Sequence, residues 1–266
     1  MKFAVIGFGF VGKAIHTALR NKHDVYIVDP LSLQVSPKYH AAIEAITDVI
    51  DGYILCVPTP DNEIGRCDDH LVYEYVRKIT EINPKAHILI KSTTSIETLD
   101  ACQQINPKVT FSPEFLRGSI SVDPTQEFLK QDFAIFGGND GRWWYEVFSE
   151  LLPIKEVRYL DIKSAGFLKY AENSFLAVKV IFFNELRELY DNIDGCNNYD
   201  AMVEALALDP RIGYSHTQVP GPDGRFGFGG HCLPKDTSEF VELGKEWHRP
   251  LNLLEKAREL NEKYRG

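Results

Sequence analysis

The side chain with the clearest chemical potential is Cys232, which follows a glycine-rich run in GPDGRFGFGGHCLPKD, residues 221–236. Glycine loses more conformational freedom on folding than other residues, so such a run indicates backbone that takes positive φ or lies close to another group. The following LPKDTSEFVELGKEW is typical of a helix start, with Pro234 in its first turn and Asp236 at the positive end of the helix dipole. A helix amino terminus and the neighbouring Lys235 both favour a thiolate. Cys232 is therefore predicted to be a nucleophile, on a loop that folds closely around a substrate and with Asp236 facing the same site.

The competing interpretation of Cys232 is a buried structural cysteine. The other cysteines are widely spread and include no pair at metal-ligand spacing, which predicts neither a disulfide framework nor a zinc site. We expect no bound metal, and most of these thiols should be inert small hydrophobes. They are Cys56, Cys67, Cys102 and Cys196.

A second chemical pair lies in FLKYAENSFL, where Lys169 and Asn173 are four residues apart and share one helix face. An ammonium and a carboxamide one turn apart can bind the hydroxyl that loses a hydride and stabilise negative charge on its oxygen. A solvated polar pair is the alternative. The segment Ile162 to Asp191 has its apolar residues too dense for one narrow stripe, which predicts a long helix buried on several sides.

The amino-terminal GFGFVG places Gly7, Gly9 and Gly12 after a predicted strand and before the predicted helix KAIHTALRN. In this context the glycines supply a tight turn, room for a pyrophosphate and close helix-on-strand packing. Asp29 ends the second predicted strand, where its carboxylate accepts hydrogen bonds from a ribose and repels a 2′-phosphate. The pattern predicts NAD rather than NADP as cofactor. A turn that merely tolerates glycine is the alternative.

Three further segments fall at strand ends, where ligands of parallel sheets bind: CVPTP, KSTT and SPEF. Thr59 and Thr93 are candidates to donate hydroxyl hydrogen bonds to cofactor or substrate. Glu114 is a candidate acid, base or positioner of water. Each also has an ordinary reading as turn material.

The helices and strands that would position these residues are predicted from the sequence. In the first 160 residues, short β-branched runs alternate with helical patterns. This alternation predicts a doubly wound, Rossmann-like α/β domain with a parallel sheet covered on both faces. The segments YDAMVEALALD and RPLNLLEKARELNEKYRG also read as helices. We therefore predict a dinucleotide-binding domain over residues 1–160 and an all-helical domain with one long central helix over residues 161–266. The predicted strands are KFAVIG, DVYIVD, YILCVP, HILIKS, VTFSPE, FAIFGG and VRYLD.

The composition and net charge of the chain limit the classes of partner that it can bind. The 266 residues are 44% hydrophobic, which is enough for a sizeable core, and they carry a net charge of −9. This charge argues against nucleic acid and against a polybasic membrane surface, so small molecules or proteins are the expected partners. No stretch approaches a membrane span, and MKFAVIGFGF does not resemble a secretory leader. We expect a cytoplasmic protein.

Taken together, GFGFVG, CVPTP, KSTT, SPEFL, LKYAENSFLAVKVIFFNE, DPRIG and FGFGGHCLPKD resemble the nucleotide-sugar dehydrogenases of the UDP-glucose 6-dehydrogenase and GDP-mannose dehydrogenase family. The resemblance implies two oxidations of a UDP- or GDP-hexose. The sugar's 6-hydroxymethyl becomes an aldehyde, a cysteine captures it as a thiohemiacetal, a second NAD oxidises this to a thioester, and water releases the uronate.

The resemblance also assigns roles by position. It makes Cys232 the nucleophile, Lys169 and Asn173 oxyanion stabilisers, Asp236 and Thr93 handlers of protons and water, Glu114 a helper in hydrolysis, and Lys235 a cofactor contact. Arg211 matches an arginine that reaches a neighbouring subunit's site, and the long helix becomes the interface of a homodimer. The implied cofactor contacts include Gly7, Gly9, Phe10, Val11, Gly12, Asp29, Thr59 and Thr93. The implied substrate contacts are Glu114, Phe115, Leu116, Lys169, Asn173, Arg211, Phe226 and Gly229.

Three departures from the family pattern leave alternatives open. PEFLRGS lacks a second glutamate that supports hydrolysis, and Gln34 stands where a basic residue often follows the ribose-binding acid. The sequence ends at Gly266, before the family's second α/β domain, so we expect poor affinity for a UDP-sugar. The Lys–Asn pair also resembles β-hydroxyacid dehydrogenases, which oxidise once. A catalytically impaired NAD-binding, dimeric or regulatory protein is the remaining alternative.

Overall fold

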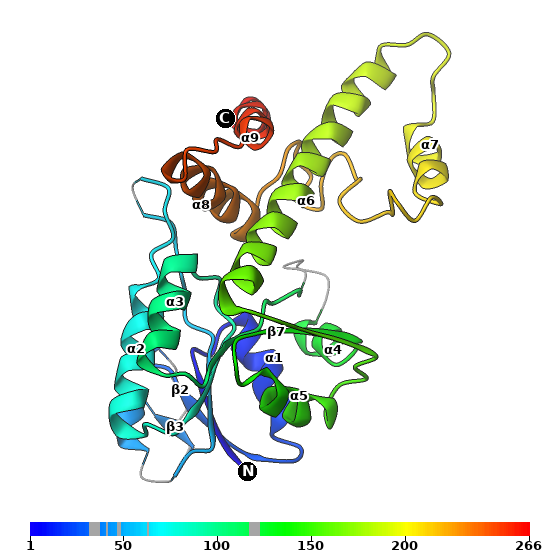
Figure 1. The fold of residues 1–266 in the computed structure, drawn as a ribbon. Helices are drawn as coiled ribbons and strands as arrows, with labels where there is room; N and C mark the ends of the chain where they lie inside the picture. The colour runs from blue at the N-terminus through cyan, green and yellow to red at the C-terminus, as the bar shows by residue number, and fades with distance from the viewer. Residues whose placement is uncertain (32–37, 41, 47–48, 63, 117–122) are drawn as a thin grey trace. The chain divides into compact units, whose positions relative to one another are not determined.

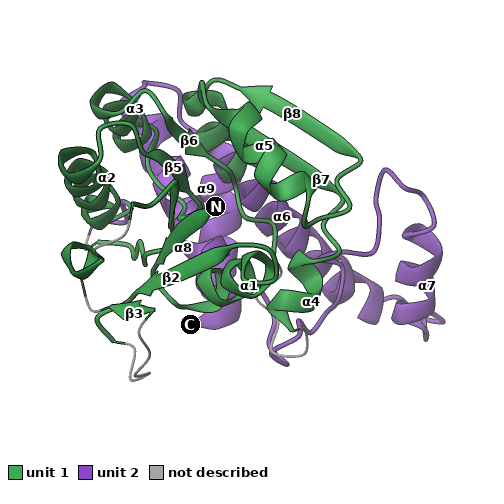
Figure 2. Cartoon of the chain, turned by 90° about the horizontal axis from the view of Figure 1, so that it is seen from below, with its two compact units in different colours: residues 1–62, 67–169 green, residues 63–66, 170–266 purple. Residues whose placement is uncertain are grey.

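The computed structural model describes residues 1–31, 38–40, 42–46, 49–62, 64–116 and 123–266. Gln34 and most of the segment after Leu116 that lacks the second glutamate lie outside these residues. The chain divides into two compact units (Figure 2). Unit 1 comprises residues 1–62 and 67–169, and unit 2 comprises residues 63–66 and 170–266.

Unit 1 contains an eight-stranded sheet of order β3-β2-β1-β4-β5-β6-β7-β8. The order of its first six strands is that of a Rossmann sheet. All seven predicted strands are present, and the sequence missed only the two-residue β3. The predicted parallel sheet is confirmed with one difference, because β7 pairs antiparallel with β6 while the other described pairs are parallel. The strands are β1 (Lys2–Ile6), β2 (Asp24–Val28), β3 (Tyr39–His40), β4 (Gly52–Leu55), β5 (His87–Ile90), β6 (Val109–Phe111), β7 (Phe133–Gly137) and β8 (Glu156–Leu160).

Helices cover both faces of this sheet, with α2 and α3 on one face and α1, α4 and α5 on the other (Figure 2). The central strands are buried along their length, so their continuous apolar runs supply residues to a core on each face. The helices of unit 1 are α1 (Phe10–Leu19), α2 (His70–Ile82), α3 (Ile96–Ile105), α4 (Pro124–Phe128) and α5 (Gly141–Ser149), with a 3₁₀ turn at Ile43–Ala45.

Local signals in the sequence set several of these helix starts. The Ser95 hydroxyl accepts a hydrogen bond from the backbone N–H of Thr98 at 3.2 Å and so caps α3. Asp123 caps α4 in the same way, through the N–H of Thr125, and Pro124 occupies the first turn of that helix.

Unit 2 is helical among its described residues. Its helices are α6 (Ile162–Asp191), which begins in unit 1, α7 (Tyr199–Leu206), α8 (Cys232–Glu246) and α9 (Asn252–Arg265). The segment between α7 and α8 runs back along α6 (Figure 1). No helix in the described part of the chain is long and apolar enough to cross a lipid bilayer.

The long helix has the predicted bounds, but its predicted burial on several sides was wrong for the isolated chain. Phe175, Phe182 and Leu189 are 66%, 57% and 61% exposed. They recur at seven-residue intervals and therefore share one face of α6. An apolar pattern indicates that a helix face is covered by protein. It does not distinguish burial within the same chain from burial against a second chain.

Candidate active site

The turn between β1 and α1 gives each glycine a separate geometric role. Gly7 has φ of +88°, and a Cβ there would lie 2.4 Å from the backbone oxygen of Cys56. A Cβ on Gly12 would lie 2.0 Å from the oxygen of Gly7, so only glycine lets α1 pack this close to the turn. Within the described ranges, a Cβ on Gly9 meets no heavy atom closer than 4 Å. Open space at Gly9, directly before the first turn of α1, is what a pyrophosphate needs.

Asp29 follows β2 and is tied to the same turn. One carboxylate oxygen accepts the N–H of Phe8 at 2.7 Å, and the other accepts the N–H of Leu31 at 2.8 Å. Each oxygen retains a further lone pair that can accept from a ribose hydroxyl. Phe10 and Val11 open α1, where Phe10 is 41% exposed and Val11 packs against the core. These residues fit an NAD molecule bound with its phosphates at the turn and its adenosine ribose at Asp29.

The segment after β6 carries Glu114 in a nearly closed setting. Its Oε1 accepts the backbone N–H groups of Phe115 and Leu116 at 2.9 and 3.1 Å. Its Oε2 lies 3.3 Å from the ammonium nitrogen of Lys91, and the two side chains are only 10% and 4% exposed. Lys91 also donates to the Pro113 oxygen at 3.2 Å. The result is a buried ion pair joining the ends of β5 and β6.

Sequence reasoning missed Lys91. Lys91 is the first residue of the KSTT segment. The residue predicted from that segment was Thr93, because its hydroxyl can donate a hydrogen bond to cofactor or substrate. A lysine that directly follows a buried strand was the available signal, because a buried ammonium needs an anionic partner.

The other predicted residues of unit 1 lie at the same strand ends. Thr59 is buried after β4, and the backbone oxygen of Thr93 accepts from the Cys67 thiol at 3.6 Å. The ammonium of Lys169 lies 5.1 Å from the ring centroid of Phe115, close enough for a cation–π contact. Lys169 is only 8% exposed, so it belongs to a buried cluster rather than to a solvated face.

In unit 2, a buried carboxylate connects α6 with the start of α8. Asp236 Oδ2 accepts from Asn173 Nδ2 at 2.5 Å, and its Oδ1 accepts from the ammonium of Lys235 at 2.6 Å. Asp236 is fully buried and Asn173 is 4% exposed. Cys232 lies one helical turn before Asp236, opens α8 and is exposed. The thiol is therefore accessible at the amino end of a helix whose first turn is fixed to α6 by hydrogen bonds.

The remaining thiols divide by burial. Burial raises the pKa of Cys56 to about 12, even though the nearby Lys91 ammonium acts in the opposite direction. Burial likewise raises the pKa of Cys102 to about 12. Cys67 is buried and Cys196 is exposed. Cys67 and Cys102 are thus buried and Cys56 is partly buried, whereas Cys196 and Cys232 are exposed.

The glycine-rich segment before Cys232 lies close to protein side chains. A Cβ on Gly227 would lie 2.5 Å from Asn261 Oδ1, and one on Gly229 would lie 2.9 Å from the guanidinium carbon of Arg265. Phe226 stacks on Tyr264 with ring centroids 6.2 Å apart. The sequence attributed these glycines to the approach of a substrate. Two of them, Gly227 and Gly229, also lie close to side chains of α9.

Arg211 is on the surface of unit 2, with its side chain 86% exposed. Its guanidinium pairs with the Asp209 carboxylate, with Nη2 2.5 Å from Oδ2. The Arg211 side chain is exposed and paired within its own chain. Its predicted contact with a neighbouring subunit stays a prediction.

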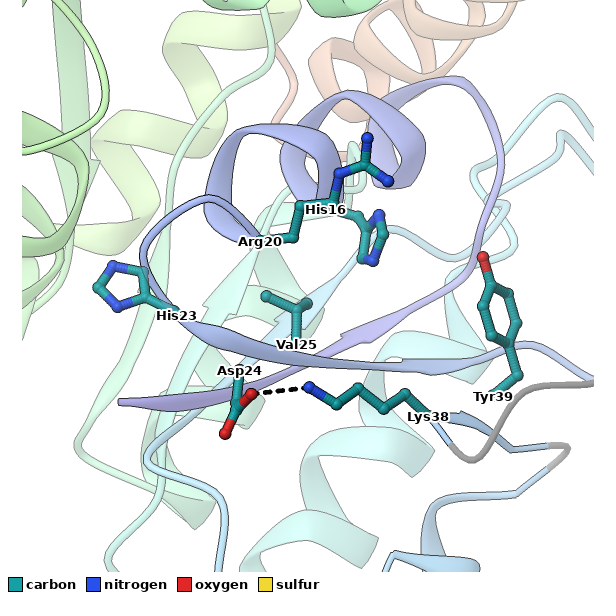
Figure 3. A pocket seen from close by; sticks show the side chains of 7 residues that line it. All are labelled: His16, Arg20, His23, Asp24, Val25, Lys38 and Tyr39. Atoms are coloured by element: carbon teal, nitrogen blue, oxygen red, sulfur yellow. Dashed lines mark hydrogen bonds and ion pairs between the residues drawn. The ribbon is translucent and has the colours of Figure 1, made fainter.

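A basic cavity of about 430 Å³ lies on unit 1 beside α1 and the starts of β2 and β3 (Figure 3). Lys38 and Asp24 form an ion pair of 2.7 Å at its rim. Burial, followed by the nearby Arg20 and Lys38 cations, lowers the pKa of His16. None of the predicted site residues is among the described residues that line this cavity, and no sequence pattern pointed to it. Its lining residues are His16, Arg20, His23, Asp24, Val25, Lys38 and Tyr39.

The sheet, the glycine turn and the following helices define a Rossmann-type dinucleotide-binding domain joined to a helical domain. Two models of one family match the chain, described as the NAD binding domain over residues 31–151 and the central domain over residues 163–263. The chain belongs to the UDP-glucose/GDP-mannose dehydrogenase family and carries its NAD binding domain.

Individual relatives agree with this assignment. The UDP-glucose 6-dehydrogenase of Rickettsia conorii is 28% identical over 96% of this chain, and the match spans 65% of that protein's length. A UDP-glucose dehydrogenase structure from the archaeon Pyrobaculum islandicum has a TM-score of 0.76 at 24% identity, covering 98% of this chain and 68% of that one. The 3-hydroxyisobutyrate dehydrogenase of Mycobacterium tuberculosis has a TM-score of 0.70 at 17% identity, covering 99% of this chain and 93% of that one. At these identities the two structures demonstrate likeness of fold alone.

Proposed function

We propose that the protein is an NAD-dependent dehydrogenase that oxidises the primary alcohol of a nucleotide sugar to a carboxylate through a cysteine-bound intermediate. One observation supports this above the others. The exposed Cys232 opens α8 one turn before a buried Asp236 that Asn173 of α6 holds in place. The likeness to UDP-glucose 6-dehydrogenases supports a nucleoside diphosphate hexose as the substrate class.

The first oxidation converts the alcohol to an aldehyde. One bound NAD would accept the hydride in this step, and a second NAD, exchanged for the NADH formed, would accept the hydride of the second oxidation. Lys169 and Asn173 lie one turn apart on α6 and donate hydrogen bonds to the sugar oxygen, stabilising the charge that develops as its proton leaves. The Asp236 carboxylate holds the Asn173 amide, so that this donor is fixed before the substrate arrives.

Cys232 then acts as the nucleophile. Its sulfur adds to the aldehyde carbon and forms a thiohemiacetal, and loss of a second hydride leaves a thioester. Water attacks the thioester, which releases the carboxylate product and restores the thiol. Glu114 is proposed to position this water, with its carboxylate held in place by the ion pair with Lys91.

The remaining predicted residues have supporting roles in this proposal. Thr93 assists in handling protons and water, and Thr59 and Lys235 contribute to cofactor binding. Phe115, Leu116, Phe226 and Gly229 are proposed to border the substrate.

We also propose that two copies of the chain associate through α6. Phe175, Phe182 and Leu189 form an exposed apolar face on α6, and exposed apolar patches of this kind often mark protein–protein interfaces. A second copy of this face would cover it, and Arg211 would extend from one copy toward the other. Phe182→Glu places a charge in this face and is expected to give a folded monomer by analytical ultracentrifugation. A dimer that persists in this variant would contradict the α6 interface.

The deciding experiment incubates the protein with NAD and a panel of UDP- and GDP-hexoses and counts NADH formed per sugar consumed. The proposal predicts two NADH per sugar and an acid product. Cys232→Ser should remove formation of the acid, whereas Cys196→Ser, which changes the other exposed thiol, should retain both oxidations. Acid formation by Cys232→Ser at the wild-type rate would refute the covalent route.

A single oxidation is the second candidate, because the 3-hydroxyisobutyrate dehydrogenase fold matches 99% of this chain while the chain matches 93% of that protein. One NADH per substrate, with Cys232→Ser fully active, would support this candidate. NAD binding without any NADH formation would instead support an NAD-binding regulatory protein.

A further inference from the structure

The loop that ends at Cys232 is fastened by side chains from two helices far away in the sequence. On the α6 side, Asn184 Oδ1 accepts the backbone N–H of Gly227 at 2.9 Å. On the α9 side, Asn261 Oδ1 accepts the N–H of the next residue, Phe228, at 2.7 Å. Two successive backbone donors of the loop therefore bond to buried or half-buried carboxamides.

Arg265 of α9 makes a third attachment. Its guanidinium donates to the Gly227 oxygen at 2.8 Å and to Asp223 Oδ2 at 2.5 Å. The guanidinium of Arg225 in turn donates to the Arg265 backbone oxygen at 2.8 Å. The side chain of Arg265 is 18% exposed and that of Asp223 is 44% exposed, so the arginine is largely covered while its partner is open to water.

Packing fixes the loop in the same position. Phe228 is 3% exposed and lies in a core formed with Ala177 and Ile181 of α6 and Ala257 of α9. Gly227 has φ of +75°, and a Cβ there would lie 3.0 Å from the Cβ of Tyr264. The loop therefore has no room to shift toward α9, and its polar groups bind it from both sides.

The last of these hydrogen bonds, at Phe228, lies four residues before the thiol. Only Gly229, Gly230 and His231 separate the buried Phe228 from Cys232, which already begins α8. Asn261 and Arg265 lie four residues apart and share one face of α9. We infer that Asn261 and Arg265 are positioning residues for Cys232, which hold the glycine-rich loop so that the thiol keeps one place at the start of α8. The contribution of Asn261 and Arg265 to catalysis rests on the proposed function. Their effect on the position of the Cys232 thiol does not.

The test measures the rate at which N-ethylmaleimide labels Cys232 in the full chain, by peptide mass spectrometry. Cys196 is exposed and precedes α7, so its labelling rate serves as an internal reference. Asn261→Leu and Arg265→Met are each expected to raise the Cys232 rate about fivefold relative to Cys196, because loss of a hydrogen bond frees the preceding loop. Asn261→Asp retains an oxygen acceptor and is expected to restore the wild-type rate.

Lys263→Met is the matched control, because it removes a cation from the same turn of α9 on an exposed side chain. It should leave the Cys232 rate unchanged. A Cys232 rate in Asn261→Leu and Arg265→Met equal to or below that of Lys263→Met would overturn the inference. An equal rise at Cys196 would also overturn it, since the effect would then be general loosening.

Turnover gives a second reading. With a nucleotide sugar that the wild type oxidises, Asn261→Leu and Arg265→Met should lower kcat about fivefold while KM for NAD stays constant, because the dinucleotide turn belongs to unit 1. Unchanged kcat in both variants would overturn the positioning role. If the wild type oxidises no sugar, the proposed function fails, and the labelling rates alone decide the inference.

Discussion

The carboxamide of Asn173 on α6 donates to the buried carboxylate of Asp236 on α8, with 2.5 Å between Nδ2 and Oδ2. The two residues are 63 positions apart in the sequence. This contact fixes the first turn of the helix that carries Cys232. The Oδ2 atom of this buried carboxylate therefore relies on the Asn173 amide for its hydrogen bond.

Asn173→Leu removes that donor while retaining most of the side-chain volume. We expect a loss of about 2 kcal/mol in the free energy of unfolding, because Asp236 keeps its charge but loses a hydrogen bond. Urea denaturation measures the change. Ser174→Ala is the control, since the neighbouring buried hydroxyl has no hydrogen-bond partner among the described residues and its removal should be nearly neutral. Equal losses in both variants would show that the contact with Asp236 contributes nothing specific.

The dinucleotide turn allows a matched pair of glycine substitutions. Gly9→Ala should retain wild-type thermal stability and weaken NAD binding about tenfold or more, because its new methyl group enters the space assigned to the pyrophosphate. Gly12→Ala should lower stability by about 2 kcal/mol, because its Cβ would lie 2.0 Å from the Gly7 oxygen. Thermal unfolding and calorimetric NAD titration separate the effects. Unchanged NAD affinity in Gly9→Ala would remove this turn from the cofactor site.

The Lys91–Glu114 pair should behave as a buried ion pair. Lys91→Met is expected to cost about 3 kcal/mol of stability, because Glu114 is left charged with little access to water. The double variant Lys91→Met with Glu114→Gln should recover part of this loss, since no charge then stays unpaired. A double-mutant cycle in urea gives the coupling energy. Additive losses would mean that the two charges do not interact.

The loop before Cys232 should respond to acid through Asp223. The hydrogen bond from Arg265 holds the pKa of Asp223 below its ordinary value of 3.8. A carboxyl group with a lowered pKa in the folded state stabilises that state above its ordinary pKa and loses this contribution as pH falls through the folded value. Hydrogen exchange of the 223–228 segment should therefore stay constant from neutral pH to about pH 5 and accelerate below about pH 4, after correction for intrinsic rates. Asp223→Asn should show faster exchange throughout and no such step.

Much of the architecture follows from local sequence patterns. The seven main strands are continuous apolar runs, and α6 begins and ends at the residues that its pattern indicates. Such elements are predictable because every residue on their buried faces must be apolar, and this produces a regular pattern in the sequence. The two-residue β3 and the antiparallel direction of β7 were not predicted. The direction of a strand depends on the path of the chain between strands rather than on the strand's own residues.

The candidate site divides in the same way. Cys232, Asp29 and the three glycines of the first turn carry signals in their type and spacing, so the sequence by itself determined them along with the family. Tertiary structure decided the partners: Lys91 for Glu114, Asn173 for Asp236, and α9 for the glycine-rich loop. The physical reason is that a buried charge or backbone amide needs a partner nearby in space, and no rule of spacing along the chain says which residue the fold will bring there.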